Sequence, residues 1–175
     1  MPQRHVKSNA EGRGDAFAEA AYAEALERAA AEARAMVKMR AGLCAGAAAA
    51  SLPGLDFLVD AASLASLFSD INRRFQLAPE DIAKLHQAQR TAIYEAILQV
   101  GAHFAGKSVT GAVALAALKQ LGARWLAGKA AGWVPIAGRG AAAGLSFWAV
   151  KTLGEAHIRE CVEVRRRVPA PLLLG

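Results

Sequence analysis

The feature that most constrains the fold is a run of apolar residues with helical spacing. Between residues 56 and 75, apolar side chains recur at steps of four, three, four, three and four: Phe57, Ala61, Leu64, Phe68, Ile71 and Phe75. These steps trace one face of an α-helix, whereas a half-buried strand alternates at every second residue. Pro53–Gly54 interrupts the chain before the run, and Asp56 can cap a helix. A helix over about residues 56–75 is therefore predicted.

Similar patterns predict helices over about residues 15–40, 79–100, 109–121, 123–131 and 140–168. Asp15 can cap the first, Pro79 suits the start of the second, and Gly101 is placed to end it. Alanine is abundant, and the β-branched and aromatic residues that favour strands are sparse. We predict an all-α fold of six or seven helices around one alanine- and glycine-rich core. Residues 1–14 are predicted to be a flexible tail, 15–168 a single helical domain, and 169–175 an apolar tail.

Charge and composition restrict the partners. The net charge is +6 and the isoelectric point about 9.7, which favours acidic partners such as anionic lipid or an acidic protein. Aromatic residues are not interleaved with basic ones, so nucleic acid is not favoured. The polar N-terminus has no apolar secretory segment, and the longest charge-free run, residues 41–55, is too short to span a bilayer. A cytoplasmic protein, peripheral at the inner face of a membrane, is predicted.

One stretch matches the phosphate loop of nucleotide-binding proteins. "GAHFAGKS" supplies Gly101, Gly106, Lys107 and Ser108 in the pattern G-x-x-x-x-G-K-[ST]. That loop needs a strand before it and a helix after it, and "AILQV" could form the strand. However, "AILQV" continues a helical stripe that begins at Ile82, and no aspartate follows Ser108 to help hold magnesium. A turn between helices is the preferred interpretation, no cofactor is predicted, and nucleotide binding remains an alternative.

Other candidate sites have simpler interpretations. His157 and Cys161 lie four residues apart and could share a metal, but both lie on an apolar stripe, so core positions are preferred. Cys44 is likewise predicted to be a buried thiol. Phe17, with Leu26, Ala33 and Val37, is predicted on the buried side of its helix. The row Gly42, Gly46 and Ala50 would let another helix approach closely.

Two stretches carry a family resemblance. "SLPGLDFLVDAASLASLFSDINRRFQLAPEDIAKL" resembles the helical domain of the immunity-related GTPases, in which a Pro-Gly break, an acidic apolar helix and an acidic restart occur in this order. "WVPIAGRGAAAGLSFWAVKTLGEAHIREC" is similar to a later part of that domain and to the YcjF-like family of bacterial proteins associated with GTPases and membranes. The resemblance covers about residues 41–167. It implies a helical domain without its own GTPase domain, acting near membranes.

These observations predict a non-enzymatic, membrane-proximal interaction module that works with a GTPase partner or by self-assembly as a homo-oligomer. The candidate surface is the basic cluster Arg165, Arg166 and Arg167, with Trp133 as an interfacial aromatic residue. Two alternatives stay open. One is a pore-forming protein that inserts residues 41–68 and 132–150 into a membrane. The other is a nucleotide-binding protein that uses Lys107.

Overall fold

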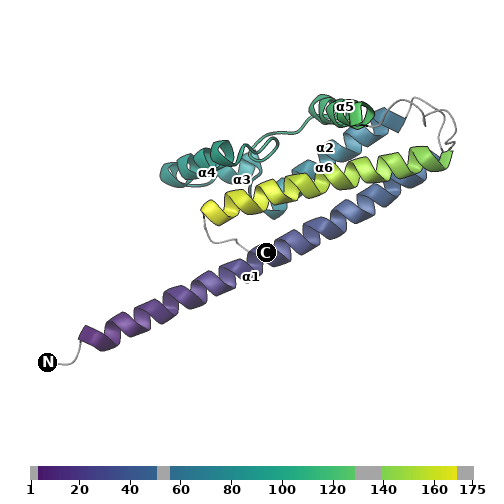
Figure 1. Cartoon of the computed structure of the whole chain (residues 1–175). Helices are drawn as coiled ribbons and strands as arrows, with labels where there is room; N and C mark the ends of the chain where they lie inside the picture. The colour runs from purple at the N-terminus through teal and green to yellow at the C-terminus, as the bar shows by residue number, and fades with distance from the viewer. Residues whose placement is uncertain (1–3, 51–55, 129–138, 169–175) are drawn as a thin grey trace.

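The computed structural model describes residues 4–50, 56–128 and 139–168, and the side chains of residues 16–49, 61–120 and 143–168. Every regular element in these ranges is an α-helix (Figure 1), and the described residues contain no strand. The helices are α1 (Arg4–Ala50), α2 (Asp56–Arg74), α3 (Pro79–Ala83), α4 (Gln87–Val100), α5 (Gly111–Gly128) and α6 (Arg139–Arg167). The all-α prediction is confirmed for this part of the chain.

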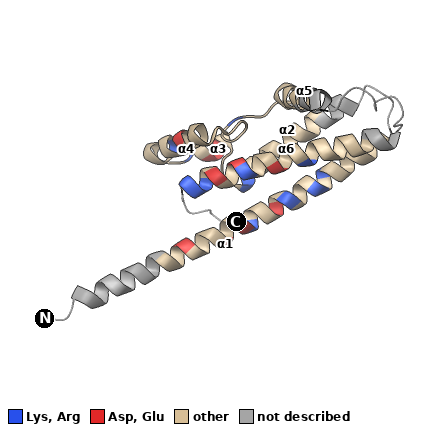
Figure 2. Cartoon of the chain, viewed as in Figure 1, with Lys and Arg blue, Asp and Glu red and all other residues tan. Residues whose placement is uncertain are grey.

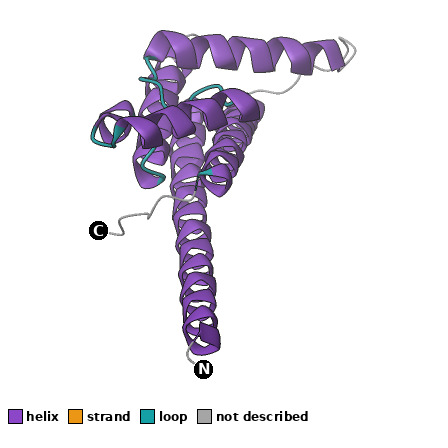
Figure 3. Cartoon of the chain, turned by 90° about the vertical axis from the view of Figure 1, so that its left-hand side faces the viewer, coloured by secondary structure: helices purple, strands orange, loops and turns teal. Residues whose placement is uncertain are grey.

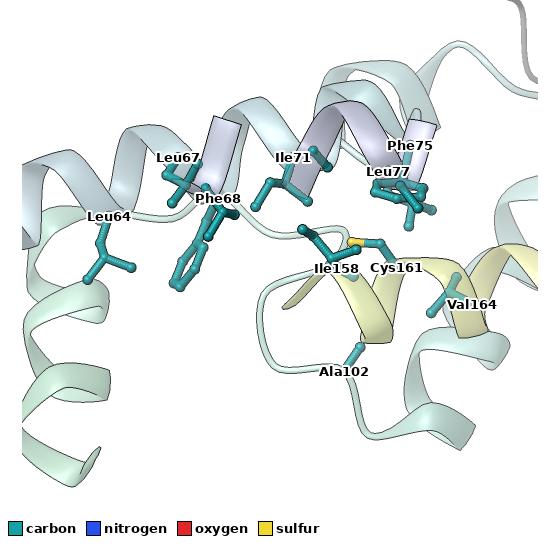
Figure 4. Close-up of a cluster of buried hydrophobic side chains, with 14 of the residues drawn as sticks. Leu64, Leu67, Phe68, Ile71, Phe75, Leu77, Ala102, Ile158, Cys161 and Val164 are labelled. Atoms are coloured by element: carbon teal, nitrogen blue, oxygen red, sulfur yellow. The ribbon is translucent and has the colours of Figure 1, made fainter. Parts of the chain in front are cut away.

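The large side chains of the core come from α2. The predicted stripe is buried at Ala61, Leu64, Phe68, Ile71 and Phe75, and the side chain of Phe57 lies outside the described residues. Figure 4 shows Ile71 and Phe75 of this stripe above α6, with Ala102 on the loop that follows α4. On the α6 side the core is made by Ile158, Cys161 and Val164.

The finer description of the core is not confirmed. Five of the helices have fourteen residues or more, and α3 has only five, so the predicted six or seven helices of a bundle are not established. Alanine fills the α1 side of the core, as at Ala30, Ala33 and Ala41, but leucine, isoleucine and phenylalanine fill the α2 side. The core is thus divided between small and large residues.

Helices α1 and α6 run antiparallel along much of their lengths (Figure 1). Tyr22, more than a third of the way along α1, donates a hydrogen bond to the carbonyl of Arg165 near the end of α6. Further along, Val37 lies against Gly154, where an added Cβ would be 2.7 Å from its Cγ2. The glycine therefore permits the close approach of the two helices. Helix α2 lies beside both, and Asp70 joins it to Arg40 of α1 at 3.2 Å.

Helices α1, α2 and α6 form one layer, and helices α4 and α5 cover its outer side. Helix α4 packs on α6, whereas α5 packs on α2 and buries Ala114 and Leu118. Figure 3 shows α5 lying across the direction of α1 rather than along it. The connection between α4 and α5 is a loop, residues 101–110, that returns to the core between α2 and α6.

Several predicted helix boundaries agree with the structure, but the predicted start of α1 does not. Helices α2 and α6 end within about one residue of the predicted limits. Helix α1 begins at Arg4 rather than Asp15, so the predicted start of this helix is wrong and residues 4–14 belong to it, whereas the flexibility of residues 1–14 stays a prediction. Gly12 and Gly14 disfavour a helix by about 1 kcal/mol each without ending it. The burial of Phe17 is also wrong, because this side chain is 79% exposed beyond the end of α6.

Residues 79–100 form two helices instead of the one predicted. The Lys84 amide donates to the carbonyl of Asp81, which tightens the last turn of α3, and His86 is extended (φ −62°, ψ 152°). This turn lets Ile82 and Ile93 enter the same core. Gly101 ends α4 in the left-handed conformation (φ 69°), which confirms its predicted role. The predicted segments 109–121 and 123–131 are joined in a single helix, α5, over Gly111–Gly128, and residues 129–131 lie outside the described residues.

Candidate functional site

The predicted phosphate loop is a loop between helices, and a helix precedes it. Residues 87–100 form α4, so "AILQV" is not a strand. Most of the loop's backbone N–H groups are already hydrogen-bonded. Ala102 donates to Ile97, His103 to the Glu160 carboxylate and Gly106 to Leu77, at 3.0–3.1 Å.

The two side chains that would act in a phosphate loop, Lys107 and Ser108, are also not arranged around a ligand. The Lys107 ammonium donates to the carbonyl of His103 at 3.1 Å, and Ser108 is exposed. A phosphate loop wraps its ligand with free N–H groups. Here the amide of Gly101 bonds to Leu98 of α4, that of Gly106 to Leu77 after α2, and that of Lys107 to Phe104 within the loop.

The loop is anchored on a buried cluster of polar side chains, which we call the polar core: Asn72 of α2 with His157, Cys161 and Arg165 of α6. The Asn72 amide nitrogen donates to the carbonyls of Phe104 at 3.0 Å and Lys107 at 3.5 Å. Its amide oxygen therefore faces His157, whose Nε2 lies 3.0 Å away and donates to that oxygen when this nitrogen is protonated. One asparagine thus ties α2, α6 and the loop together.

The polar core reaches the surface through Glu160. This carboxylate accepts hydrogen bonds from the His103 amide at 3.0 Å and ring at 2.9 Å, and it lies 3.6 Å from Nδ1 of His157. Burial raises the pKa of Glu160, but these hydrogen bonds outweigh it and hold the pKa below its usual value. His103 is exposed and His157 fully buried. Glu160 therefore connects a solvated histidine to a buried one.

The cysteine of the polar core is not set up for chemistry. Burial raises the pKa of the Cys161 thiol, and the charge of Glu160 raises it further. The thiol therefore stays protonated at neutral pH, and the thiolate is the reactive form. Cys161 and Cys44 are both buried, as predicted. Within the described residues no group of three or more His, Cys, Asp or Glu side chains could hold a metal ion.

The predicted basic surface is only partly a surface. Arg165 is 1% exposed, so its placement on a membrane or partner surface is wrong. Its Nε donates to the carbonyl of Phe75 at 2.7 Å and its Nη2 to that of Gln76 at 3.0 Å, where α2 has ended. Burial lowers the pKa of this guanidinium, although arginine remains charged at any ordinary pH. The side chain caps a helix end instead of facing solvent.

The other two arginines are exposed but paired. Arg166 lies 3.5 Å from Glu27 of α1, and Arg167 lies 3.1 Å from Glu163 one turn earlier on α6. Trp133 and residues 169–175 lie outside the described residues. Of the predicted surface, Arg166 and Arg167 therefore remain as exposed cations whose charge is partly balanced within the chain.

The opposite end of the α1–α6 pair presents a different surface, which lies within the two segments, residues 41–68 and 132–150, that the pore-forming alternative predicts to insert into a membrane. Residues 41–50 of α1 and 140–150 of α6 contain no charged residue, and Figure 2 shows both helices without acidic or basic positions there. Four large apolar side chains in these segments are exposed: Leu43, Leu145, Phe147 and Trp148. We call this region the charge-free end.

Glycines of the charge-free end also face open space. A Cβ added at Gly42, Gly46 or Gly144 would meet no other atom within 4 Å. The predicted helix-approach row of Gly42 and Gly46 is thus not covered by another helix among the described residues. The signal that could have revealed this end is the coincidence of charge-free segments on two helices that pair antiparallel.

No described helix is long and apolar enough to cross a bilayer. Comparison with known proteins found no family model, no curated protein and no solved structure that matches this chain. The family resemblance of the sequence therefore stays a prediction.

Proposed function

We propose that this chain is a non-enzymatic, membrane-proximal interaction module that contacts its target through the charge-free end. The observation that carries the proposal is the exposure of Leu43, Leu145, Phe147 and Trp148 on segments that contain no charge. Exposed apolar side chains gathered in one region mark sites of membrane or protein contact. Indole rings in particular suit the boundary between lipid headgroups and acyl chains.

The geometry of the other candidate sites supports a binding role over an enzymatic one. The His157 and Cys161 side chains are buried and contact Asn72, and the amides of the phosphate-loop motif bond to the chain itself. At the charge-free end, by contrast, Leu43, Leu145, Phe147 and Trp148 are exposed. Peripheral binding at the cytoplasmic face of a membrane is the mode that we propose.

The proposed partner is a GTPase or a second copy of the chain. The GTPase is supported by the sequence resemblance over residues 41–167 alone. Self-assembly is supported by the same resemblance and by exposed helix faces such as that of Gly42 and Gly46.

Vesicle co-sedimentation tests the membrane contact. The double variant Leu43→Glu/Leu145→Glu places two charges at the charge-free end. Its binding to vesicles should fall by roughly tenfold or more, because burial of each leucine contributes about 1.5–3 kcal/mol. Leu98→Glu is the matched control, since Leu98 is 79% exposed on α4, outside this end. Equal binding by both variants, or no binding by the wild type to neutral or anionic vesicles, would refute membrane contact through this end.

A pore-forming activity is the second candidate. Its support is that the described parts of the predicted inserting segments, residues 41–68 and 132–150, include both halves of the charge-free end. Insertion would require these helices to leave the α2 core, so dye should escape from vesicles that the protein binds. Binding without dye release would exclude this candidate and leave the peripheral module intact.

A further inference from the structure

Helix α1 projects well beyond the other helices. Tyr22 is level with Arg165, close to the end of α6, and residues 16–21 are all exposed. Figures 1 and 3 show the N-terminal part of α1 extending alone from the rest of the molecule. At 1.5 Å per residue, residues 4–21 project by about 27 Å.

A helix of this kind gains little stability by itself. Most helical stability in proteins comes from packing of one face, and short isolated helices are marginal in water. One row at helical spacing could supply such a face: Val6, Ala10, Gly14, Phe17 and Ala21, at steps of four, four, three and four. Phe17 is its large member and is 79% exposed.

The charges of the projecting segment identify what could cover that row. Residues 4–14 contain Arg4, Lys7 and Arg13 against a single acid, Glu11. Residues 15–27 contain four acids and neither lysine nor arginine: Asp15, Glu19, Glu24 and Glu27. A second copy of the segment placed antiparallel would set basic against acidic residues at both ends, whereas a parallel copy would set like charges together.

We propose that two copies of this chain pair antiparallel through residues 4–24 of α1, crossing near Gly14. Phe17 of each copy then packs against Ala10 of the other, and the glycine at the crossing allows close approach. The inference rests on the self-assembly part of the proposed function. It uses the end of α1 remote from the charge-free end, so dimerisation and vesicle binding can fail independently.

The mass of the full chain in solution, measured by light scattering or sedimentation equilibrium without lipid, tests the pairing. The wild type should form a dimer, and Phe17→Glu should weaken it by about tenfold or more, since the phenylalanine would otherwise be buried twice. Leu98→Glu is again the control and should leave the dimer intact. Circular dichroism should show that Phe17→Glu remains folded. A monomeric wild type, or a dimer that Phe17→Glu does not weaken, would overturn the proposal.

A charge exchange tests the orientation. Lys7→Glu/Arg13→Glu makes the segment acidic, and Asp15→Lys/Glu19→Lys makes it basic. Each variant alone should be monomeric, and an equal mixture should form a heterodimer. Arg90→Glu/Lys119→Glu, at exposed positions of α4 and α5, is the control with the same change of charge as the acidic variant. Dimers of each variant alone that are as tight as wild type would exclude antiparallel pairing.

Discussion

The two ends of the α1–α6 pair use polarity in opposite ways. At one end the polar core is buried, and Asn72, His157 and Arg165 bond to the loop and to the carbonyls after α2. At the charge-free end, residues 41–50 of α1 and 140–150 of α6 contain no charge, and leucine, phenylalanine and tryptophan side chains are exposed. Polar side chains are thus buried at the end that contains the polar core. Large apolar side chains are exposed at the charge-free end, where we propose that a partner binds.

The glycines show the same difference. Gly154 touches Val37, and a Cβ at Gly106 would be 2.7 Å from Ile97, so both sites near the polar core are closely packed. Gly42, Gly46 and Gly144 at the charge-free end have open space around them. Close packing marks the end with the polar core, and open glycines beside exposed apolar side chains mark the end that we propose for binding.

The largest expected effect comes from Arg165 in the polar core. Arg165→Ala should lower the free energy of unfolding by about 3 kcal/mol, because the carbonyls of Phe75 and Gln76 would lose a charged donor in a buried position. Arg166→Ala should lower it by less than about 1 kcal/mol, since its pair with Glu27 is exposed to solvent. Urea denaturation measures both. Equal decreases in the free energy of unfolding for the two variants would contradict the expectation that the buried arginine contributes more than the exposed one.

An intermediate effect is expected from two helical glycines. Gly154→Ala should destabilise the protein by about 1–2 kcal/mol, since the new Cβ would be within 2.9 Å of both methyl groups of Val37. Gly46→Ala should instead stabilise it by up to about 1 kcal/mol, because alanine favours the helix and the site is open. Thermal unfolding measures both changes, and adding Val37→Ala should remove much of the Gly154→Ala penalty. Destabilisation by Gly46→Ala would show that the charge-free end is packed.

The smallest expected effect concerns Glu160 and pH. Its folded-state pKa lies below the unfolded value, so the stability that it contributes is present above the unfolded pKa and is lost as pH falls through the folded one. Glu160→Gln should remove that acid-dependent part, a difference on the order of 1 kcal/mol at neutral pH that fades below about pH 4. Unfolding curves from pH 7 to 3 measure it. A gap that widened as the pH fell would contradict the sign.

The fold class and several elements followed from local signals. The stripe over α2, Pro79 at the start of α3 and Gly101 at the end of α4 each depend on neighbours within a few residues, so spacing alone identified them. The extent of α1 did not follow, because residues 4–14 contain only two apolar residues, Val6 and Ala10, and two glycines. The break between α3 and α4 was also missed, since it serves the joint burial of Ile82 and Ile93 in one core.

The candidate site was likewise predicted only in part from the sequence. The arginines at residues 165–167 look equivalent in sequence, yet position on the helix buries Arg165 and leaves Arg166 and Arg167 at the surface. Asn72 carried no recognisable motif, although it joins three segments of the chain. Its importance comes from contacts between residues more than thirty positions apart, which local spacing does not encode.

The sequence by itself determined that this chain is helical, where α2 and α6 lie, and which segments contain no charge, because helical period and composition are local properties. Only the tertiary structure decided that two of those segments share one end, that Arg165 lies inside, and that most amides of "GAHFAGKS" are bonded within the chain. Those outcomes depend on which helix faces meet. Antiparallel packing of α1 on α6 selects one face of each helix for burial, and that selection decides which residues remain available to a partner.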